Sequence, residues 1–355
     1  MTVALLEGSE AIADAMVAAG CRFFSGYPMT PFTEVLEHMA AKLPAVGGTC
    51  MNAESELEAI GMAWGAAATG TPSATGSTGQ GLSLMQESLS EAALARIPLV
   101  VLNMARAQGD YWQSTRGPGH GDSRMPVLAP MDVPEAITLT QLAFHLAFRW
   151  RNPVLLFGDY YLAHTATSVD VDAVDPVPLP ADDWSLTGST SGSGRARLVS
   201  PLGSGNHGPE SSYAAHLVEC ARATQDMLDG IEPLAETGFI DDADVVVIAF
   251  GTPAKYVRAA VSRLRAEGAR VGFVRPITLL PFPSEIVASA ARGARAVAVY
   301  ENNQGQMVDD VRLALHGAVP VQFIGRLSLD SSGFGIAPDL DRDYLRDRLL
   351  EVLNG

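Results

Sequence analysis

Hydrophobic residues alternate between two patterns along the first half of the chain. Short apolar, β-branched runs predict strands, which we place at 22–25, 73–75, 99–103 and 153–157. Apolar positions at helical spacing predict helices between them, which we place at 9–20, 54–69 and 82–95. Ser9 is expected to cap the first helix, and Thr30 to cap another that has Pro31 in its first turn. Strands alternating with helices of this length indicate an α/β fold with a parallel sheet.

A second unit of the same kind follows a break in the pattern. Residues 182–208 are rich in Ser, Gly and Asn, a composition typical of a connection, and a helix is expected over 211–234. Further strands are expected at 244–250, 271–274, 296–300 and 321–324, with a helix over 253–267. We therefore divide the chain into a first domain (1–185), a linker with a connecting helix (186–238) and a second domain (239–355).

The charge balance narrows the class of partner. The 355 residues include 24 Lys and Arg against 40 Asp and Glu, a net charge of −16, and 47% are hydrophobic, which excludes wholesale disorder. An acidic chain repels phosphate backbones and anionic lipid, so we expect neither nucleic acid nor a membrane as partner. Apolar runs such as 97–104 are shorter than the roughly 20 residues that cross a bilayer. The N-terminus has no basic start, which favours a cytoplasmic location.

Cysteine and histidine usage argues against a metal centre on this chain. Cys21, Cys50 and Cys220 are an odd number, widely spaced and outside any CxxC motif. This distribution is typical of a reduced chain without disulfides, a zinc site or an iron–sulfur cluster. The seven histidines form no HExxH pair. We expect no metal bound by the side chains of this chain.

Two glycine-rich segments could contact a ligand. Residues 76–81, GSTGQG, lie between a predicted strand and helix, where backbone amides and the helix dipole favour an anion; a tight turn without a ligand fits equally well. Residues 203–208, GSGNHG, have the form of a dinucleotide fingerprint, but no strand precedes them. Because the strand that a dinucleotide site requires is missing from the predicted pattern, a nucleotide-linked dehydrogenase is a weak hypothesis for this chain.

Charged side chains at the start of one predicted helix and after one predicted strand are the candidates for chemistry. Glu54 and Glu58 share a helix face and suit the start of a helix, whereas Glu56 lies on another face. Small residues over 59–67 allow the predicted helix 54–69 to pack closely against another backbone or a flat ligand. Arg106 follows the strand 99–103, at the edge where open α/β sheets bind ligands. The loop after it adds Arg116 and His120, which would suit a small anion; a solvated loop is the alternative.

These segments together resemble a known family. GYPMTP, the AESE helix, SLMQES, LVVLNMAR, QGDYWQSTRGPGHGD, RNPVLLFGD, DWSLTGS, AFGTPAK, RPITLLPFP and ENNQGQM are similar, in order, to the alpha subunit of the 2-oxoacid:ferredoxin oxidoreductases. QSTRGPGHGD and DWSLTG resemble the 2-oxoisovalerate, or branched-chain, branch. The resemblance implies a thiamine diphosphate pyrimidine-binding fold followed by a domain like the C-terminal domain of transketolase.

The resemblance also implies cofactors and partners. Thiamine diphosphate would be shared with a beta subunit that carries the diphosphate site, Mg²⁺ and a [4Fe-4S] cluster, and gamma and delta subunits are compatible with it. Ferredoxin, coenzyme A and a 2-oxoacid would complete the reaction. This chain has no GDG motif followed at the expected distance by Asn, which agrees with a diphosphate site elsewhere. It would be active only with its partner.

Site residues are assigned through the family motifs. The pattern E-x-x-A-x-G identifies Glu56 as the glutamate that activates the aminopyrimidine, with Glu54 as the alternative. Thr30 would hydrogen-bond the substrate and Arg106 would pair with its carboxylate. Tyr27, Pro28, Gly79 and Gly81 would contact the cofactor, and Arg116 and His120 would contribute to the substrate site.

The chain departs from the family pattern in two places. Met29 stands where Ile is usual and Phe32 where a small or polar residue is common, so the pocket around Thr30 is expected to be reshaped. The glycine-rich segment after Arg106 is shortened, which gives Arg116 or His120 a possible role in its place. In the second domain, Glu301, Asn303 and Gln306 are expected to have structural roles.

The expected reaction is a coenzyme A-dependent oxidative decarboxylation. The 2-oxoacid is expected to be branched, such as 2-oxoisovalerate, and would give acyl-CoA and CO₂ with electrons passed to ferredoxin. 2-Oxoglutarate, pyruvate or an aryl 2-oxoacid are alternatives within the class. A non-catalytic assembly subunit is the alternative outside it.

Overall fold

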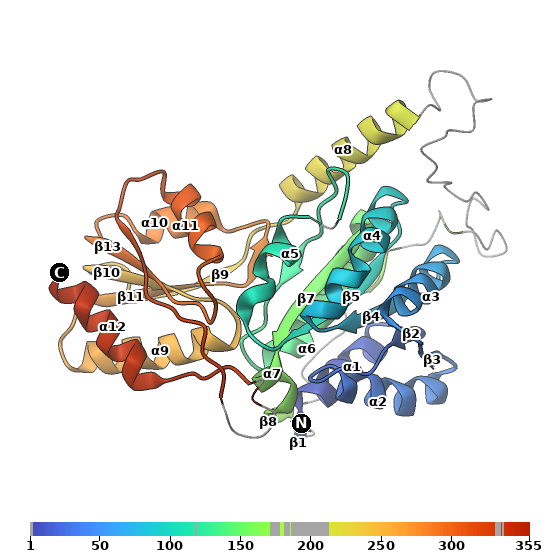
Figure 1. Cartoon of the computed structure of the whole chain (residues 1–355), viewed down its shortest axis with the longest axis horizontal. Coiled ribbons are helices and arrows are strands. Elements are labelled where there is room, and N and C mark those ends of the chain that lie inside the picture. The colour runs from blue at the N-terminus through green and yellow to red at the C-terminus, as the bar shows by residue number, and fades with distance from the viewer. Residues whose placement is uncertain are drawn as a thin grey trace.

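The computed structural model describes residues 3–117, 119–170, 178–180, 185, 213–330, 335 and 337–355. Figure 1 shows two sheets side by side, each covered by helices, with the earlier part of the chain forming the right-hand unit and the later part the left-hand unit. This arrangement confirms the predicted α/β fold class. The boundaries set at 185 and 238 stay a prediction, because 186–212 lie outside the described residues, as do the glycines of 203–208.

The first sheet has seven strands in the order β12-β6-β7-β5-β4-β2-β3. Its parallel strands are β2 (Phe23–Gly26), β3 (Thr49–Asn52), β4 (Ser73–Ser77), β5 (Leu99–Ala105), β6 (Val127–Leu128) and β7 (Pro153–Asp159). Every residue of β4, β5 and β7 is buried, as expected for parallel strands covered on both faces. The carboxyl ends of these strands meet at one edge of the sheet.

Helices cover both faces of the first sheet. One layer comprises α1 (Gly8–Ala18), α2 (Thr33–Lys42) and α6 (Val133–Trp150), and the other comprises α3 (Glu56–Ala68), α4 (Gly79–Leu94) and α5 (Tyr111–Thr115). Successive side chains of β5 point to opposite faces of the sheet. Val100 and Leu102 pack against the first helix layer, and Leu99 and Val101 pack against the second.

The second sheet has five strands in the order β14-β13-β10-β11-β9. They are β9 (Ala235–Gly238), β10 (Val245–Ile248), β11 (Val271–Pro276), β13 (Ala296–Val299) and β14 (Val321–Phe323), with β9 antiparallel. Helices α9 (Gly251–Ala266) and α12 (Arg342–Asn354) pack on one face, and α10 (Ser284–Ala290) and α11 (Met307–Leu315) on the other. The α10–α11 face belongs to the same hydrophobic core as α3 and α4, so the two sheets share buried apolar surface.

One strand that crosses to the other sheet and a buried ion-pair network join the two units. β12 (Thr278–Leu280), from the second half of the chain, pairs antiparallel with β6 of the first sheet. The buried Arg275 guanidinium donates two hydrogen bonds to Glu135 of α6, at 2.8 and 2.9 Å, and one to Glu236 of β9 at 2.8 Å. The packing of one sheet against the other is therefore specific.

The remaining elements lie at the periphery. Strand β1 (Val3–Glu7) pairs antiparallel with β8 (Ala166–Asp170), next to the short helix α7 (Tyr160–His164). The 3₁₀ turns are η1 (Leu43–Val46) and η2 (Gln108–Asp110), and helix α8 (Tyr213–Gly230) extends away from the sheets (Figure 1). Among the helices of the described residues, none is both long and apolar enough to span a membrane.

The predicted helix caps were wrong in two places. Helix α1 begins at Gly8 after Glu7, and the Ser9 hydroxyl instead donates to the carbonyl of Ala163 at 3.0 Å. Helix α2 begins at Thr33 after Phe32 rather than after Thr30. In both cases a residue at the start of the helix makes a tertiary contact that the local pattern does not show. Phe32 is fully buried and stacks on Phe24 of β2, with ring centroids 6.0 Å apart.

Candidate active site

The buried carboxylate of Glu56 lies at the carboxyl edge of the first sheet. Helix α3 begins at Glu56, after the N-cap residue Ser55, whose hydroxyl accepts a hydrogen bond from the backbone N–H of Leu57 at 3.2 Å. The side chain of Glu56 is only 2% exposed, and its Oε1 accepts a hydrogen bond from Ser77 Oγ, at the end of β4, at 2.9 Å. Glu54 precedes the helix and is exposed. Burial therefore distinguishes the two glutamates that the sequence left open.

Gly81 allows the first turn of α4 to approach this carboxylate. A Cβ atom at position 81 would overlap both Ser77 Oγ and Glu56 Oε1, so a side chain there would displace one of them. The structure thus brings together Glu56, Ser77 and the glycine-rich turn that follows β4. Sequence reasoning identified Glu56 and Gly81 but missed Ser77, whose signal was its position as the last residue of a buried strand.

Arg106 and Thr30 come together from β5 and from the segment after β2. The Nε–H of Arg106 donates to the backbone carbonyl of Thr30 at 3.3 Å. A cavity of about 330 Å³ opens beside Arg106. Its lining residues are Thr78, Gly79, Gln80, Ser83, Arg106, Ala107, Gly109, Asp110 and Gln113. Tyr27 and Pro28, which follow β2, are exposed.

Asp110 is a residue of this cavity that sequence reasoning missed. Its carboxylate accepts hydrogen bonds from Asn103 Nδ2 at 3.3 Å and from Gln113 Nε2 at 3.0 Å. Burial raises the pKa of Asp110, although these two hydrogen bonds and the charge of Arg106 act in the opposite direction. A Cβ at Gly79 would collide with this carboxylate. The available signal was an acidic residue four positions after Arg106, beyond the end of a buried strand.

The segment that carries Arg106 is held by the second sheet. We call residues 106–116 the arginine loop and residues 301–310 the clamp segment. The Gln108 side chain accepts a hydrogen bond from the N–H of Asn302 at 2.9 Å and donates to the carbonyl of Phe250 at 2.9 Å. Asn303 Nδ2 donates to the Gln108 carbonyl at 2.9 Å. These bonds fix the loop immediately after Arg106.

Further bonds continue along the arginine loop. Gln306 Nε2 donates to the Gly109 carbonyl at 2.8 Å, and Gln306 Oε1 accepts from the N–H of Trp112 at 2.8 Å. Asp310 accepts the Tyr111 hydroxyl at 2.6 Å and pairs with Arg116 at 2.7 Å. The clamp segment therefore holds the loop at both ends.

Glu301 organises the clamp segment itself. It is fully buried, and its carboxylate accepts hydrogen bonds from Asn303 Nδ2 at 2.9 Å and from the backbone N–H groups of Met307 at 2.7 Å and Val308 at 3.0 Å. The N–H of Gln306 adds a longer bond at 3.2 Å. Burial raises the pKa of Glu301, and its hydrogen bonds oppose that shift. These contacts fit the structural role expected for Glu301, Asn303 and Gln306.

The structure places Arg116 and His120 outside the lining of the Arg106 cavity. Arg116 pairs with Asp310, as described above, and His120 Nε2 lies 3.2 Å from Glu91 Oε1 of α4. Glu87, Glu91 and His120 each place one ligand atom within 4.8 Å of the others, which is the geometry of a candidate metal-binding group. Among the predicted substrate residues, the structure brings Thr30 and Arg106 together and leaves these two apart.

Comparisons with known proteins place the chain in a family. Residues 14–217 match the family described as pyruvate flavodoxin/ferredoxin oxidoreductase, thiamine diphosphate-binding, and residues 243–331 match pyruvate:ferredoxin oxidoreductase core domain II. Ketoisovalerate oxidoreductase subunit VorB of Methanothermobacter thermautotrophicus is 35% identical, over 92% of this chain and 94% of that protein. 2-Oxoglutarate synthase subunit KorA of Methanothermobacter marburgensis is 32% identical, over 91% and 94%.

Solved structures extend the likeness to the whole fold. The 2-oxoglutarate:ferredoxin oxidoreductase from Magnetococcus marinus superposes with a TM-score of 0.83 at 27% identity, over 99% of this chain and 65% of that longer chain. A split-gene transketolase, at 15% identity and a TM-score of 0.62, shares the fold alone. The chain belongs to the family of 2-oxoacid:ferredoxin oxidoreductase subunits that contain a thiamine diphosphate-binding domain.

Proposed function

We propose that this chain forms the pyrimidine side of a split active site that oxidatively decarboxylates a branched-chain 2-oxoacid. The observation that carries the proposal is the buried Glu56 carboxylate, with Ser77 on one oxygen and the glycine turn of α4 beside it. Burying a carboxylate without a cationic partner costs free energy, and Glu56 has one hydrogen-bond donor among the described residues to offset it. Its remaining acceptor capacity favours a ligand-binding role over that of an assembly subunit.

The residues at this edge fit the aminopyrimidine ring of thiamine diphosphate. Gly81 keeps a side chain away from Glu56, and in this proposal Tyr27, Pro28 and Gly79 contact the cofactor as well. Glu56 would accept a hydrogen bond from the protonated N1′ of the ring and thereby increase the basicity of the exocyclic nitrogen. Bound thiamine diphosphate supplies the carbon nucleophile that attacks the 2-oxo carbon.

Arg106 and Thr30 supply the substrate contacts. The Arg106 guanidinium would pair with the substrate carboxylate and hold it beside the reacting carbon, and the Thr30 hydroxyl would donate a hydrogen bond to the substrate. The overall reaction converts the 2-oxoacid, coenzyme A and two oxidised ferredoxins into acyl-CoA, CO₂, a proton and two reduced ferredoxins. The cavity beside Arg106 bears one described cation, which suits a substrate with a single carboxylate.

The single cation favours a 2-oxoacid with an apolar side chain over 2-oxoglutarate. A second substrate carboxylate would be placed near Asp110 rather than near a second cation. The relative named for ketoisovalerate, at 35% identity, supports the same choice, while the relative named for 2-oxoglutarate, at 32%, makes 2-oxoglutarate the main competing substrate. Pyruvate and aryl 2-oxoacids carry a single carboxylate each, so one cation at the cavity suits them as well.

A partner subunit would complete the site. Large apolar side chains are exposed on several elements at this edge of the first sheet, a feature typical of a protein interface. They are Tyr27, Met51, Leu57, Leu84 and Trp112. We propose that a beta subunit covers them and brings the diphosphate site, Mg²⁺ and a [4Fe-4S] cluster, which passes electrons to ferredoxin.

Anaerobic purification of the tagged chain from its native host tests the split site. We expect a companion chain together with thiamine diphosphate and iron in stoichiometric amounts. A chain that purifies alone and without cofactor, under conditions that preserve complexes, would overturn the catalytic proposal and favour an assembly role.

A panel of substrates tests the side-chain preference. We expect the highest kcat/KM for 2-oxoisovalerate, measured by coenzyme A-dependent reduction of a viologen dye against 2-oxoglutarate, pyruvate and phenylpyruvate. A higher kcat/KM for 2-oxoglutarate would refute the argument from the single cation.

A further inference from the structure

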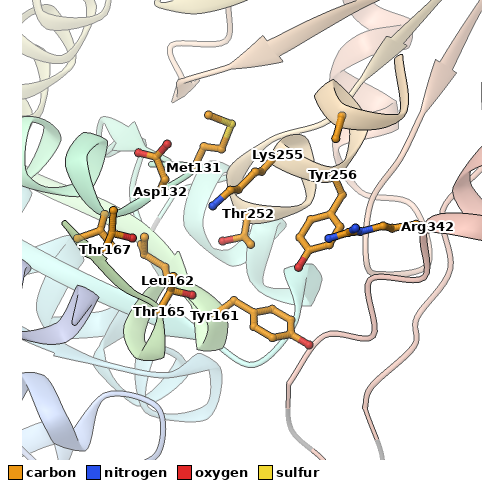
Figure 2. A pocket seen from close by; sticks show the side chains of 12 residues that line it. Met131, Asp132, Tyr161, Leu162, Thr165, Thr167, Thr252, Lys255, Tyr256 and Arg342 are labelled. Atoms are coloured by element: carbon orange, nitrogen blue, oxygen red, sulfur yellow. The ribbon is translucent and has the colours of Figure 1, made fainter. Parts of the chain in front are cut away.

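A second cavity lies where the two sheet units meet, and we call it the seam pocket. It has a volume of about 320 Å³ and shares no lining residue with the cavity beside Arg106. Figure 2 shows side chains converging from the start of α6, from α7 and β8 of the first unit, and from α9 and α12 of the second. Its lining residues are Met131, Asp132, Val133, Tyr161, Leu162, Thr165, Thr167, Thr252, Lys255, Tyr256, Ala259 and Arg342.

Two solvent-exposed cationic residues, Lys255 and Arg342, border the seam pocket, and neither forms an ion pair among the described residues. The Lys255 ammonium has no hydrogen bond or ion pair there, and the Arg342 guanidinium contacts the ring of Tyr256, 5.4 Å from its centroid. In Figure 2 the Lys255 side chain extends across the pocket toward Thr252 and Asp132. The tyrosine hydroxyls of the lining, on Tyr161 and Tyr256, are also without a hydrogen-bond partner among these residues.

Two carboxylates at or next to the pocket are held in place by hydrogen bonds. Asp132 is the N-cap of α6, and its Oδ1 accepts the N–H of Glu135 at 3.1 Å. Asp159, buried beneath the pocket, accepts the N–H of Leu162 and the hydroxyl of Thr252, each at 2.9 Å. Lys255 forms no ion pair among the described residues, whereas the other lysine of the chain, Lys42, lies 2.6 Å from Asp14 and 3.4 Å from Glu10.

The rest of the lining favours an organic ligand over a bare inorganic ion. Met131, Val133, Leu162 and Ala259 provide apolar surface between the polar groups, and the two tyrosines add aromatic surface. Small-molecule sites typically combine such surface with a few placed polar groups, in cavities of about 300 Å³ or more. In a chain of net charge −16, the two cations of this lining outnumber its one acidic residue, Asp132, so the pocket favours an anion.

We propose that the seam pocket binds a small organic anion. A phosphate or carboxylate group lies between Lys255 and Arg342, and an apolar or aromatic body packs against Met131, Leu162 and the tyrosine rings. Because the pocket is formed by both units, the ligand stabilises their packing.

The two lysines of the chain provide a direct test. The full chain, purified with its accompanying subunits, is treated with an amine-acetylating reagent, and the modification of Lys255 and Lys42 is followed by peptide mass spectrometry. Adenosine 5′-monophosphate, phenylpyruvate and inorganic phosphate are the probes. Lys42 is the internal reference; burial lowers its pKa, but its contacts with Asp14 and Glu10 raise it overall, so it reacts slowly and independently of the ligand.

We expect an organic anion to protect Lys255 and leave Lys42 unchanged, with a dissociation constant about 10-fold or more below that of inorganic phosphate. Protection by the monophosphate alone identifies a phosphate ligand, and protection by phenylpyruvate alone identifies a carboxylate ligand; either supports the proposal. No protection at about 10 mM, or equal protection by inorganic phosphate, overturns it. The readout is local to Lys255, so it is independent of whether the proposed reaction is correct.

Variants assign the binding to the two cations. Lys255→Gln and Arg342→Gln should each weaken binding of the protecting anion about 10-fold or more in calorimetry, because each removes a charge-assisted contact. Arg292→Gln, which changes an exposed arginine elsewhere on the second unit, is the matched control. An equal loss in the control, or unchanged binding in both pocket variants, overturns the assignment.

Discussion

Two buried glutamates, one in each sheet unit, differ in how their oxygens are occupied. Glu301 accepts hydrogen bonds from four donors of its own segment, three of them backbone N–H groups at the start of α11. Glu56 is almost as buried, yet Ser77 is the donor found for it among the described residues, and a glycine turn lies beside it. A carboxylate whose oxygens accept several hydrogen bonds from its own segment, as in Glu301, stabilises the structure of that segment. A carboxylate that can accept further hydrogen bonds, as in Glu56, is available to a ligand.

The same contrast extends to the regions around the two residues. The edge of the first sheet carries Glu56, Thr30 and Arg106, the residues proposed to contact cofactor and substrate. The clamp segment of the second sheet provides hydrogen bonds that hold the arginine loop in place. Chemistry and positioning are thus separated between the two units, so variants in each should fail in different ways.

Replacing Glu56 should have the largest effect. In Glu56→Gln the side chain can no longer act as the anionic acceptor for a ring nitrogen, and we expect kcat to fall by about 10²- to 10⁴-fold in the assembled complex. The decarboxylation rate and the elution volume on size exclusion measure the two effects separately. Glu54→Gln, which changes the exposed alternative, should retain full activity. Normal turnover in Glu56→Gln would contradict the catalytic role of Glu56 and leave it, like Glu301, with a structural role.

Removing Arg106 should mainly weaken substrate binding. Arg106→Ala deletes a charge-assisted contact of about 1.5–3 kcal/mol, which corresponds to a KM increase of about 10- to 100-fold. Arg106→Lys keeps the charge but loses the planar donor pair and should give an intermediate KM. Steady-state kinetics on the preferred 2-oxoacid measures both. An unchanged KM in Arg106→Ala would move the carboxylate contact to another cation.

Replacing Glu301 should lower the stability of the protein more than it lowers kcat. In Glu301→Gln an amide replaces one oxygen that faces backbone N–H donors, so a buried donor is left unpaired and the free energy of unfolding should fall by about 1–3 kcal/mol. Thermal and denaturant unfolding measure this loss. Glu285→Gln, an exposed change in α10, should shift stability by less than about 0.5 kcal/mol. A loss of kcat without a loss of stability would contradict the structural role.

Gln306 tests the clamp more selectively. Gln306→Ala removes the bonds to Gly109 and Trp112, and we expect kcat/KM to fall roughly 5- to 30-fold because Arg106 becomes less well oriented. The exposed Gln304, two residues earlier, provides a matched control, and Gln304→Ala should be neutral. If both variants behave alike, the clamp does not position the arginine loop.

Asp110 should give the smallest effect, visible as a pH dependence. Its raised pKa keeps the carboxyl protonated above the usual value of 3.8, and as the pH rises further its ionisation adds a negative charge beside Arg106. KM for the anionic substrate should therefore increase with pH in the native enzyme and stay flat in Asp110→Asn. Asp122→Asn, an exposed change in the same region, should keep the native profile. A native profile in Asp110→Asn would exclude Asp110 from the substrate site.

Local pattern predicted many of the parallel strands but missed several elements, among them the long helices α6 and α12. The expected strand at 153–157 corresponds to β7, and the expected helix at 253–267 to α9, each within two residues at either end. The strands β6, β9 and β12 are two to four residues long and carry no readable period, so neither their existence nor the insertion of β12 into the first sheet could be predicted. The early start of α4 at Gly79 was missed because glycine is a poor helix former.

The sequence by itself determined the α/β class, the family and the location of Thr30 and Arg106 after predicted strands, and it identified Glu56 through a family motif. These properties follow from local periodicity and from motifs of a few residues. Only the tertiary structure decided which glutamate is buried, that Asp110 faces Arg106, that Gln108 is held by Asn302 across 194 residues, and that Lys255 and Arg342 border one pocket. The burial of Glu56 and the approach of Asp110 to Arg106 depend on packing within the first unit, whereas the contacts of Gln108 and the seam pocket depend on how the two sheet units pack together. Tertiary contacts of this kind leave no periodic signal along the chain.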